Sequence, residues 1–235
     1  MQALRLNEHY VSVQGEGPHV GEMTQFIRFS GCNMRCPGWP CDTQFAIQPS
    51  LWKDDPKVQP DDIIERALQI RTSTGASRVC LTGGEPFMQQ KDLLHKLFMD
   101  LISHDFKIDV FSNGSYIYPS WAFDRHVTFV MDWKLPGSGE GQTKLEERMI
   151  NARQLRTTDC IKFVVKDRSD LEVADIIYTD WMEGEGQVQA KIFVGRVWGQ
   201  ITDQEIIEYL QEHELPWLLN VQVHKYIWHP DIRGV

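Results

Sequence analysis

The segment from Thr24 to Cys41 reads TQFIRFSGCNMRCPGWPC and joins a strand pattern to a loop that carries three cysteines. Residues 24–29 are rich in apolar side chains and predict a β-strand. Cys32, Cys36 and Cys41 follow this strand within a few residues. In sheets of parallel strands, functional groups lie at the carboxyl ends of the strands. The segment therefore predicts a metal-binding loop at one edge of such a sheet.

The three thiols of this loop suit two kinds of metal site. Thiolates are soft ligands for iron–sulfur clusters or zinc, and a structural zinc site needs four ligands. No neighbouring cysteine or histidine supplies a fourth, whereas three cysteines on a four-iron cluster leave one iron open to a substrate. The loop alone still allows three unrelated cysteines, or a zinc site completed from elsewhere. Cys80 and Cys160 lie in apolar strands and are expected in the core.

The rest of the chain alternates between strand and helix patterns. Further strands are predicted at 78–82, 108–111, 127–131, 160–165, 190–194 and 218–223, and helices from about 61, over 93–102, 145–155 and 171–181, and after Thr202. Residues 116–125 leave little room for a full helix, and 48–60 and 136–142 are predicted loops. Such alternation predicts an α/β fold, a partial (β/α)6-type barrel of mostly parallel strands with reduced helices. We expect one domain over 1–235, with the cluster-binding loop at 31–43.

Polar residues occur where several of these strands end. Gly83-Gly84-Glu85-Pro86 follows the second predicted strand and Ser112-Asn113-Gly114 the third. Asp132-Trp133-Lys134 follows the fourth, and Gly195-Arg196 a later one. These clusters are expected to meet the cysteine loop at one edge of the sheet.

Composition and charge exclude several classes of protein. The chain has 235 residues, 42% of them hydrophobic, and a formal net charge of −9, which disfavours nonspecific binding to nucleic acid. No apolar run approaches the roughly 20 residues that cross a bilayer, and the first residues do not resemble a secretory signal. Clustered thiols are typical metal ligands in reducing compartments. We expect a cytoplasmic protein with no nucleic-acid or membrane partner.

The motifs resemble those of the radical S-adenosylmethionine superfamily. That superfamily carries Cys-x3-Cys-x2-Cys and Gly-Gly-Glu-Pro after successive strands; the second motif is matched at 83–86. The first is lengthened, because Pro37, Gly38, Trp39 and Pro40 separate Cys36 from the third cysteine. Within the superfamily the chain resembles the 7-carboxy-7-deazaguanine synthase family. That likeness lies in Val13-Gln14-Gly15-Glu16-Gly17, Arg28-Phe29-Ser30-Gly31-Cys32-Asn33, Cys41-Asp42-Thr43, Leu81-Thr82-Gly83-Gly84-Glu85-Pro86, Asn113-Gly114 and Gln222-Val223-His224-Lys225-Tyr226.

The family resemblance implies a reaction and its cofactors. The substrate is 6-carboxy-5,6,7,8-tetrahydropterin, whose ring contracts with loss of ammonia to give 7-carboxy-7-deazaguanine, a precursor in queuosine and other deazapurine biosynthesis. The cofactors are a 4Fe-4S cluster, S-adenosylmethionine and Mg²⁺. The open iron holds S-adenosylmethionine, which is cleaved to a radical that takes a hydrogen from the carboxylate-bearing ring carbon. A reductant protein such as flavodoxin and a homodimer are further implications.

The same resemblance assigns residues to each ligand. The cluster ligands are Cys32, Cys36 and Cys41, with Thr43 on magnesium. S-adenosylmethionine is expected at Gly83, Gly84, Glu85, Ser112, Asn113, Asp132, Lys134 and Gly195. The pterin is expected at Val13, Gln14, Gly15, Glu16, Arg28, Thr82, His224 and Lys225.

Several of these residues also have plain structural explanations. The glycine pair and Asn113-Gly114 suit ordinary turns, and the Thr43 hydroxyl can bond to the backbone. Lys134 serves equally well as a surface lysine. Arg28 suits a carboxylate, but in an apolar strand it also suits a buried ion pair. His224 and Lys225 are expected at the end of the last strand.

Two other functions fit part of the sequence. A glycyl-radical activase is a second radical enzyme, although activases often carry extra cluster motifs and no cysteines remain here to form one. A non-enzymatic zinc-binding module is the third possibility. A cluster after anaerobic reconstitution separates the radical enzymes from the zinc module.

Overall fold

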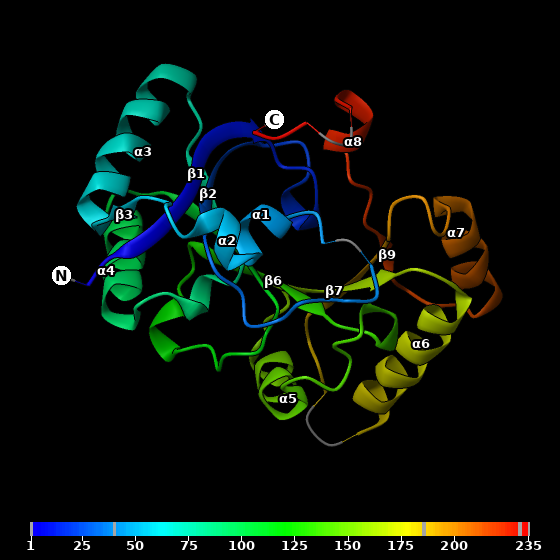
Figure 1. Cartoon of the computed structure of the whole chain (residues 1–235). Coiled ribbons are helices and arrows are strands. Elements are labelled where there is room, and N and C mark those ends of the chain that lie inside the picture. Colours follow the sequence, from blue (N-terminus) through cyan, green and yellow to red (C-terminus); the bar gives the residue numbers. More distant parts are fainter. Residues whose placement is uncertain (1, 40, 185–186, 230–231, 235) are drawn as a thin grey trace.

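A computed structural model describes residues 2–39, 41–184, 187–229 and 232–234 (Figure 1). Within these ranges one sheet has the strand order β3-β1-β2-β4-β5-β6-β7-β8-β9. Every neighbouring pair from β2 to β9 is parallel, and β1 pairs antiparallel with both β2 and β3. The predicted partial barrel of mostly parallel strands is therefore confirmed. The strands are β1 (Leu4–Val13), β2 (Met23–Phe29), β3 (Lys57–Val58), β4 (Arg78–Gly83), β5 (Lys107–Ser112), β6 (Val127–Trp133), β7 (Cys160–Val165), β8 (Lys191–Arg196) and β9 (Leu218–Leu219).

The longer helices connect successive parallel strands and follow one another around the outside of the sheet in Figure 1. They are α3 (Pro60–Thr74), α4 (Lys91–Ser103), α5 (Leu145–Gln154), α6 (Arg168–Glu183) and α7 (Asp203–Glu212). The short elements are α1 (Gln44–Ile47), α2 (Pro49–Trp52), α8 (His224–Ile227) and the 3₁₀ turns η1 (Gly17–His19), η2 (Pro86–Met88), η3 (Ser120–Ala122) and η4 (Pro136–Ser138). As predicted, Thr202 caps α7, where its hydroxyl accepts the Glu205 amide at 3.1 Å.

Three sequence-based predictions are corrected. The strand before the cysteine loop is the second of the chain, because β1 precedes it and was not predicted. The predicted strand 218–223 is limited to β9, and His224 and Lys225 begin α8 instead of ending a strand. The predicted loop 48–60 contains α2, β3 and the first residue of α3. Pro40, one of the four residues that lengthen the cysteine loop, lies outside the described residues.

One continuous apolar core lies between the sheet and its outer helices. Its fully buried members include Phe29, Phe98, Phe129 and Phe163, from strands β2, β6 and β7 and from α4. Burial of aromatic rings on this scale fixes the strands against the helices. The carboxyl ends of the parallel strands, with the loops that follow them, are therefore held at one edge.

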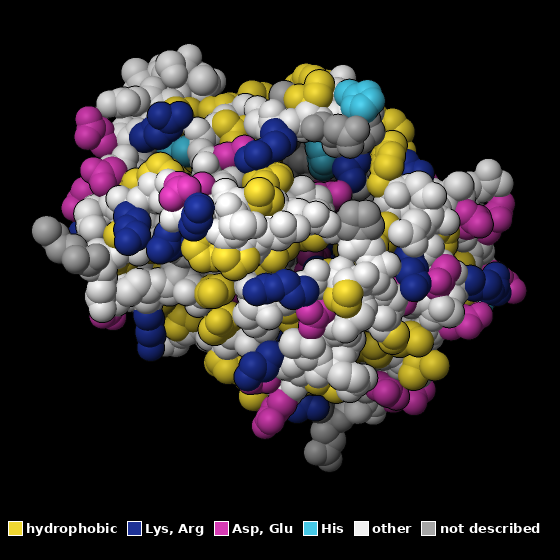
Figure 2. Space-filling model, viewed as in Figure 1, with side chains coloured by type: hydrophobic (Ala, Val, Ile, Leu, Met, Phe, Trp, Pro, Cys, Tyr) yellow, Lys and Arg dark blue, Asp and Glu magenta, His cyan; other side chains and the backbone are white. Residues whose placement is uncertain are grey.

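The molecular surface has no single-sign patch on the face drawn in Figure 2. Acidic and basic side chains are interspersed across it. Among the described residues, no helix is both long and apolar enough to cross a membrane.

Candidate active site

A cavity of about 670 Å³ opens at the carboxyl ends of the parallel strands. Its size is in the range typical of small-molecule sites. All the residues expected at the site line it except Glu85. They are Val13, Gln14, Gly15, Glu16, Arg28, Cys32, Cys36, Cys41, Thr43, Thr82, Gly83, Gly84, Ser112, Asn113, Asp132, Lys134, Gly195, His224 and Lys225. Loops that are distant in sequence thus share one cavity.

The cysteine loop brings its three thiols into one small cluster. Cys32 and Cys36 are buried with Met34 and Ile47, and Cys41 packs against them. Burial raises the pKa of Cys32 to about 11 and raises that of Cys36 as well. These thiols stay protonated at neutral pH until a metal displaces the proton.

Polar groups surround the sulfur atoms. The Met34 amide donates to Cys32 Sγ at 3.4 Å, and Asn113 Nδ2 donates to the same sulfur at 3.7 Å. Thr43 Oγ1 lies 3.4 Å from Cys41 Sγ and donates to the Gly83 carbonyl at 3.3 Å. Hydrogen bonds to cluster sulfurs tune the reduction potential, so these contacts suit a redox centre. Thr43 does make the backbone bond that was its plain structural explanation.

The donor set fits a cluster with an open iron. Within the described residues, no three His, Cys, Asp or Glu side chains are arranged to hold one metal ion. Ligands of a four-iron cluster do not share one metal position, because each thiolate binds a different iron. The three thiols line the same cavity as the glycine pair, so a cluster held by them would adjoin a space that a ligand can enter.

The glycine pair allows the end of β4 to pass very close to the start of the cysteine loop. A Cβ on Gly84 would lie 1.8 Å from the Gly31 carbonyl oxygen, and Gly83 has a φ of +116°. The Gly84 amide donates to the Phe29 carbonyl at 2.9 Å. The two glycines therefore fix the cysteine loop to β4, and only glycine fits this approach.

We predict that Gly84→Ala separates these two segments. The added methyl group meets backbone, which has no rotamer to yield, so we expect a loss of about 1–3 kcal/mol in the free energy of unfolding. Denaturant unfolding of Gly84→Ala beside the unsubstituted protein tests this; equal stability of the two would contradict it.

Glu85 ties two loops together from behind the cavity. Its carboxylate is fully buried and accepts hydrogen bonds from Ser112 Oγ (2.9 Å), the Asn113 amide (2.8 Å) and the Phe87 amide (3.1 Å). Burial raises the pKa of Glu85 to about 7, and the three donors only partly offset it. In this structure Glu85 orients Ser112 and Asn113 and does not itself line the cavity.

A chain of alternating charges crosses the floor of the cavity. Lys162 Nζ lies 2.6 Å from Glu16 Oε2 and 3.0 Å from Asp132 Oδ1, and Lys134 Nζ lies 3.1 Å from Asp132 Oδ2. Gln222 Nε2 donates to Glu16 Oε1 at 2.7 Å. The chain links Glu16, expected at the pterin, to Lys134, expected at S-adenosylmethionine. The Lys134 side chain is only 13% exposed and is paired within this chain, so it is not a surface lysine.

Lys134 and Lys162 determine the charge state of Asp132 and Glu16. Burial alone would raise the pKa of Asp132, but Lys134 and Lys162 outweigh it and lower the pKa to about 2. Lys162 likewise outweighs burial at Glu16 and lowers its pKa. Both carboxylates are therefore charged at neutral pH.

Lys162 is a cavity residue that the sequence analysis did not identify. It lies in the apolar strand β7 and is only 6% exposed. A lysine that deep in an apolar strand needs a charged partner. The same reasoning that singled out Arg28 would have found it.

Arg28 forms the ion pair that was considered for it and also lines the cavity. Its Nε donates to Glu8 Oε2 at 2.9 Å, and a terminal nitrogen donates to Tyr10 Oη at 3.0 Å. The guanidinium lies over the Phe45 ring, 5.4 Å from its centroid. Glu8, Tyr10 and Phe45 thus fix the orientation of the planar Arg28 guanidinium and of its remaining N–H donors.

His224 and Lys225 close the cavity beside Glu16. A Cβ on Gly15 would lie 2.2 Å from His224 Nδ1, so the imidazole packs directly on the Gln14-Gly15-Glu16 backbone. Burial lowers the pKa of His224, which favours its neutral form. Lys225 Nζ lies 3.1 Å from Asp42 Oδ2. Both residues reach the cavity from the start of α8.

A family model and two sequence relatives indicate the same kind of protein. Residues 13–131 match the family model described as a 4Fe-4S single cluster domain. A 7-carboxy-7-deazaguanine synthase from Clostridium acetobutylicum is 33% identical, with 97% of each chain covered. One from Koribacter versatilis is 30% identical, covering 99% of this chain and 100% of the relative.

Two solved structures share the fold. QueE from Escherichia coli superposes with a TM-score of 0.65 at 22% identity, and 94% of each chain is covered. SuiB from Streptococcus suis, solved with S-adenosylmethionine, superposes with a TM-score of 0.52 at 13% identity, covering 83% of this chain and 48% of that one. At these identities the likeness concerns the fold.

Proposed function

The chain belongs to the 7-carboxy-7-deazaguanine synthase family, and we propose that it contracts 6-carboxy-5,6,7,8-tetrahydropterin to 7-carboxy-7-deazaguanine with loss of ammonia. It is a radical S-adenosylmethionine lyase that uses a 4Fe-4S cluster, S-adenosylmethionine and Mg²⁺. The observation that carries the proposal is the shared cavity, which gathers three thiols, an ion-paired carboxylate (Glu16) and an oriented guanidinium (Arg28).

The protein's own residues supply binding, orientation and exclusion of water. When bound, the cluster and S-adenosylmethionine supply a carbon-centred radical that abstracts hydrogen from the substrate. Cys32, Cys36 and Cys41 would hold the cluster. Thr43, whose hydroxyl lies beside Cys41, would be a magnesium ligand, which fits a cation that takes few protein ligands and keeps its waters.

The S-adenosylmethionine site would lie against the glycine pair. Gly83 and Gly84 line the cavity, while Ser112 and Asn113 are held in place by Glu85. Lys134 offers a cation for the carboxylate or hydroxyl groups of the cofactor, and Asp132 keeps that lysine charged. Gly195, at the end of β8, completes this side.

The pterin site would lie between Glu16 and Arg28. A charged carboxylate at Glu16 can accept hydrogen bonds from the guanidine-like edge of the pterin. Arg28 can bind the substrate carboxylate through two parallel hydrogen bonds. Val13, Gln14, Gly15, Thr82, His224 and Lys225 would form the walls.

We predict that Arg28→Gln raises KM for the carboxytetrahydropterin about 10- to 100-fold, since a charged hydrogen bond contributes about 1.5–3 kcal/mol. Cluster content should be unchanged. Arg28→Lys should recover only part of the loss, because one ammonium cannot reproduce the planar pair of donors. Steady-state kinetics with both variants measures this, and an unchanged KM in Arg28→Gln would count against the carboxylate role.

We also propose a single radical S-adenosylmethionine domain over 1–235, a homodimer, a flavodoxin-like reductant and a cytoplasmic location. A net charge of −9 and the clustered thiols support the last of these. Size-exclusion chromatography with light scattering tests the dimer.

Anaerobic reconstitution tests the class of enzyme. We expect a brown protein with the absorbance of an iron–sulfur cluster, with iron and sulfide in about equal amounts. A colourless protein that holds one zinc ion would contradict the proposal and favour the zinc-binding module.

A further inference from the structure

The lengthened cysteine loop rests on the turn that follows β6. We call residues 136–141 the docking turn. The Gly38 amide donates to the Ser138 carbonyl at 3.1 Å, and a Cβ on Gly38 would lie only 1.7 Å from the Gly137 carbonyl oxygen. A Cβ on Gly139 would lie 2.6 Å from Pro37 Cγ. Backbone therefore packs directly on backbone between two segments about 100 residues apart.

The docking turn is itself fixed from behind. The fully buried Arg148, from α5, donates to the carbonyls of Lys134 (3.2 Å), Glu140 (3.4 Å) and Gly141 (2.7 Å). Asp170 accepts from the Gly137 amide at 2.8 Å. A turn held at both ends by buried side chains provides a rigid support.

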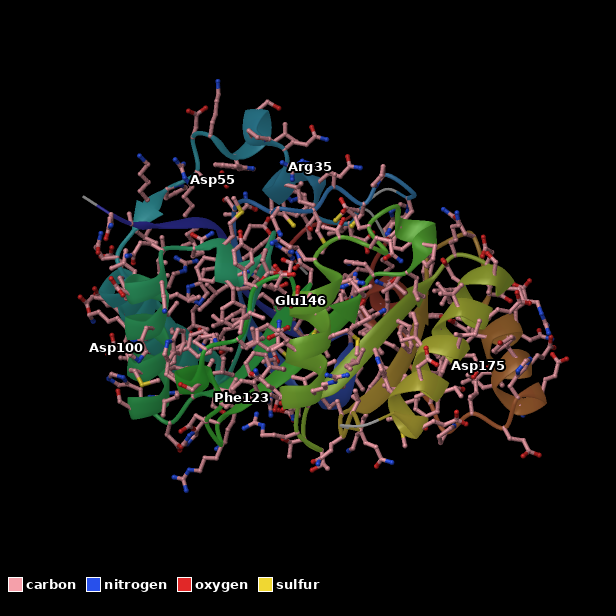
Figure 3. All side chains as sticks on the ribbon, turned by 90° about the horizontal axis from the view of Figure 1, so that it is seen from below. Arg35, Asp55, Asp100, Phe123, Glu146 and Asp175 are labelled. Carbon is pink, nitrogen blue, oxygen red and sulfur yellow. The ribbon has the colours of Figure 1, made fainter. Side chains whose placement is uncertain are left out.

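Glu140 reaches from this support to the cysteine loop. One carboxylate oxygen, Oε1, accepts from the Arg35 amide at 2.7 Å and the Cys36 amide at 3.4 Å, and Oε2 accepts from Thr143 Oγ1 at 2.5 Å. Figure 3 shows Arg35 at the rim of the molecule, on the segment that carries the cysteines.

Cys36 has a backbone conformation that needs such support. Its φ is +45°, in the left-handed region that residues other than glycine seldom occupy. A residue keeps this conformation only where its surroundings hold it. The Glu140 carboxylate supplies an acceptor for its amide and for the amide before it.

We propose that Glu140 is a positioning residue that holds the Arg35-Cys36 backbone so that the Cys36 thiolate is placed to bind the cluster. It acts on the cluster only through this backbone. The inference rests on the proposed function, because it presupposes the cluster. It adds that retention of the cluster depends on a residue far from the cysteine motif.

The first test compares iron release from Glu140→Ala, Glu140→Gln and Glu147→Ala after anaerobic reconstitution. We expect a ferrous chelator to remove iron about tenfold faster from Glu140→Ala, as the loss of a charged hydrogen-bond acceptor implies. Glu140→Gln keeps a neutral acceptor oxygen and should release iron at a rate between those of wild type and Glu140→Ala. Glu147 is an acid nearby that pairs with the exposed Lys144, so Glu147→Ala should also match wild type.

A second pair of variants leaves Glu140 and the cysteines intact. Gly139 and Gly75 share a φ of +76°, so alanine strains both backbones alike. Only the Gly139 methyl group meets the cysteine loop, since a Cβ on Gly75 has nothing within 4 Å. We expect faster iron release and an altered low-temperature EPR spectrum of the reduced cluster in Gly139→Ala alone. This pair carries the test if Glu140→Ala fails to fold.

Wild-type iron retention in both Glu140→Ala and Gly139→Ala would overturn the proposal and leave the proposed function standing. Release from Glu140→Gln as fast as from Glu140→Ala would overturn the hydrogen-bond account. A wild-type chain that takes up no cluster would overturn this proposal and the proposed function together.

Discussion

Replacing Cys41 with alanine is expected to abolish the iron–sulfur cluster and reduce turnover to background. Three thiolates are the minimum that holds a four-iron cluster with one open iron, and the described residues of this cavity offer no further cysteine except Cys80. Cys80 is fully buried in β4, where desolvation raises the pKa of its thiol well above the usual value. It is therefore a poor replacement ligand.

Cys160→Ala is the matched control for this experiment. Cys160 is buried in the core beside Val130 and Phe193 and does not line the cavity. Its loss should cost about 1 kcal/mol of stability and leave iron content unchanged. Iron content, sulfide content and absorbance of both variants, measured after anaerobic reconstitution, test this prediction. Full iron content and activity in Cys41→Ala would show that the lengthened loop is ligated in another way.

Lys162→Met is expected to have the largest effect on stability. It leaves the Glu16 and Asp132 carboxylates, whose side chains are 15% and 28% exposed, with one cation fewer, and breaking a largely buried ion pair costs at most about 3–5 kcal/mol. Since Lys162 also aims Glu16, KM for the pterin should rise more than kcat falls. Lys96→Met is the control, because Lys96 pairs with Asp61 and Asp100 at the surface, where such a loss costs at most about 1 kcal/mol.

A double variant separates charge balance from substrate binding. Lys162→Met combined with Glu16→Gln removes one cation and one anion, so it should regain part of the stability that Lys162→Met loses. Activity should not return, because Glu16 is lost as an acceptor for the pterin. Urea unfolding and steady-state kinetics measure the two effects. A Lys162→Met protein as stable as Lys96→Met would contradict the charge network.

Local signals in the sequence predicted most of the fold. The apolar periodicity of α4 and the capping box at Thr202 are both encoded within a few residues, and both elements form as expected. Strand β1 was missed because its buried positions, Leu4, His9 and Ser12, are irregularly spaced and two of them are polar, and because its place in the sheet depends on pairing with β2. Pairing of this kind depends on residues distant in the chain.

The candidate site was likewise predictable where its signal is local, and not where it depends on residues distant in the chain. Motifs after strands indicated the cysteine loop and the glycine pair, since strand ends are local features. The partners of those motifs were not predictable, because Glu85 turns toward Ser112 and Lys162 toward Glu16 across the sheet. The docking turn was predicted only as a glycine-rich loop, yet Gly139 leaves no room for a Cβ against Pro37, and Gly38 leaves none against the Gly137 carbonyl.

Turnover under anaerobic conditions tests the central claim most directly. The reconstituted protein is mixed with 6-carboxy-5,6,7,8-tetrahydropterin, S-adenosylmethionine, Mg²⁺ and a reductant, and the products are separated and identified by mass. We predict 7-carboxy-7-deazaguanine, formed only when the cluster is intact. No deazaguanine product from a protein with a full cluster would contradict the proposed function.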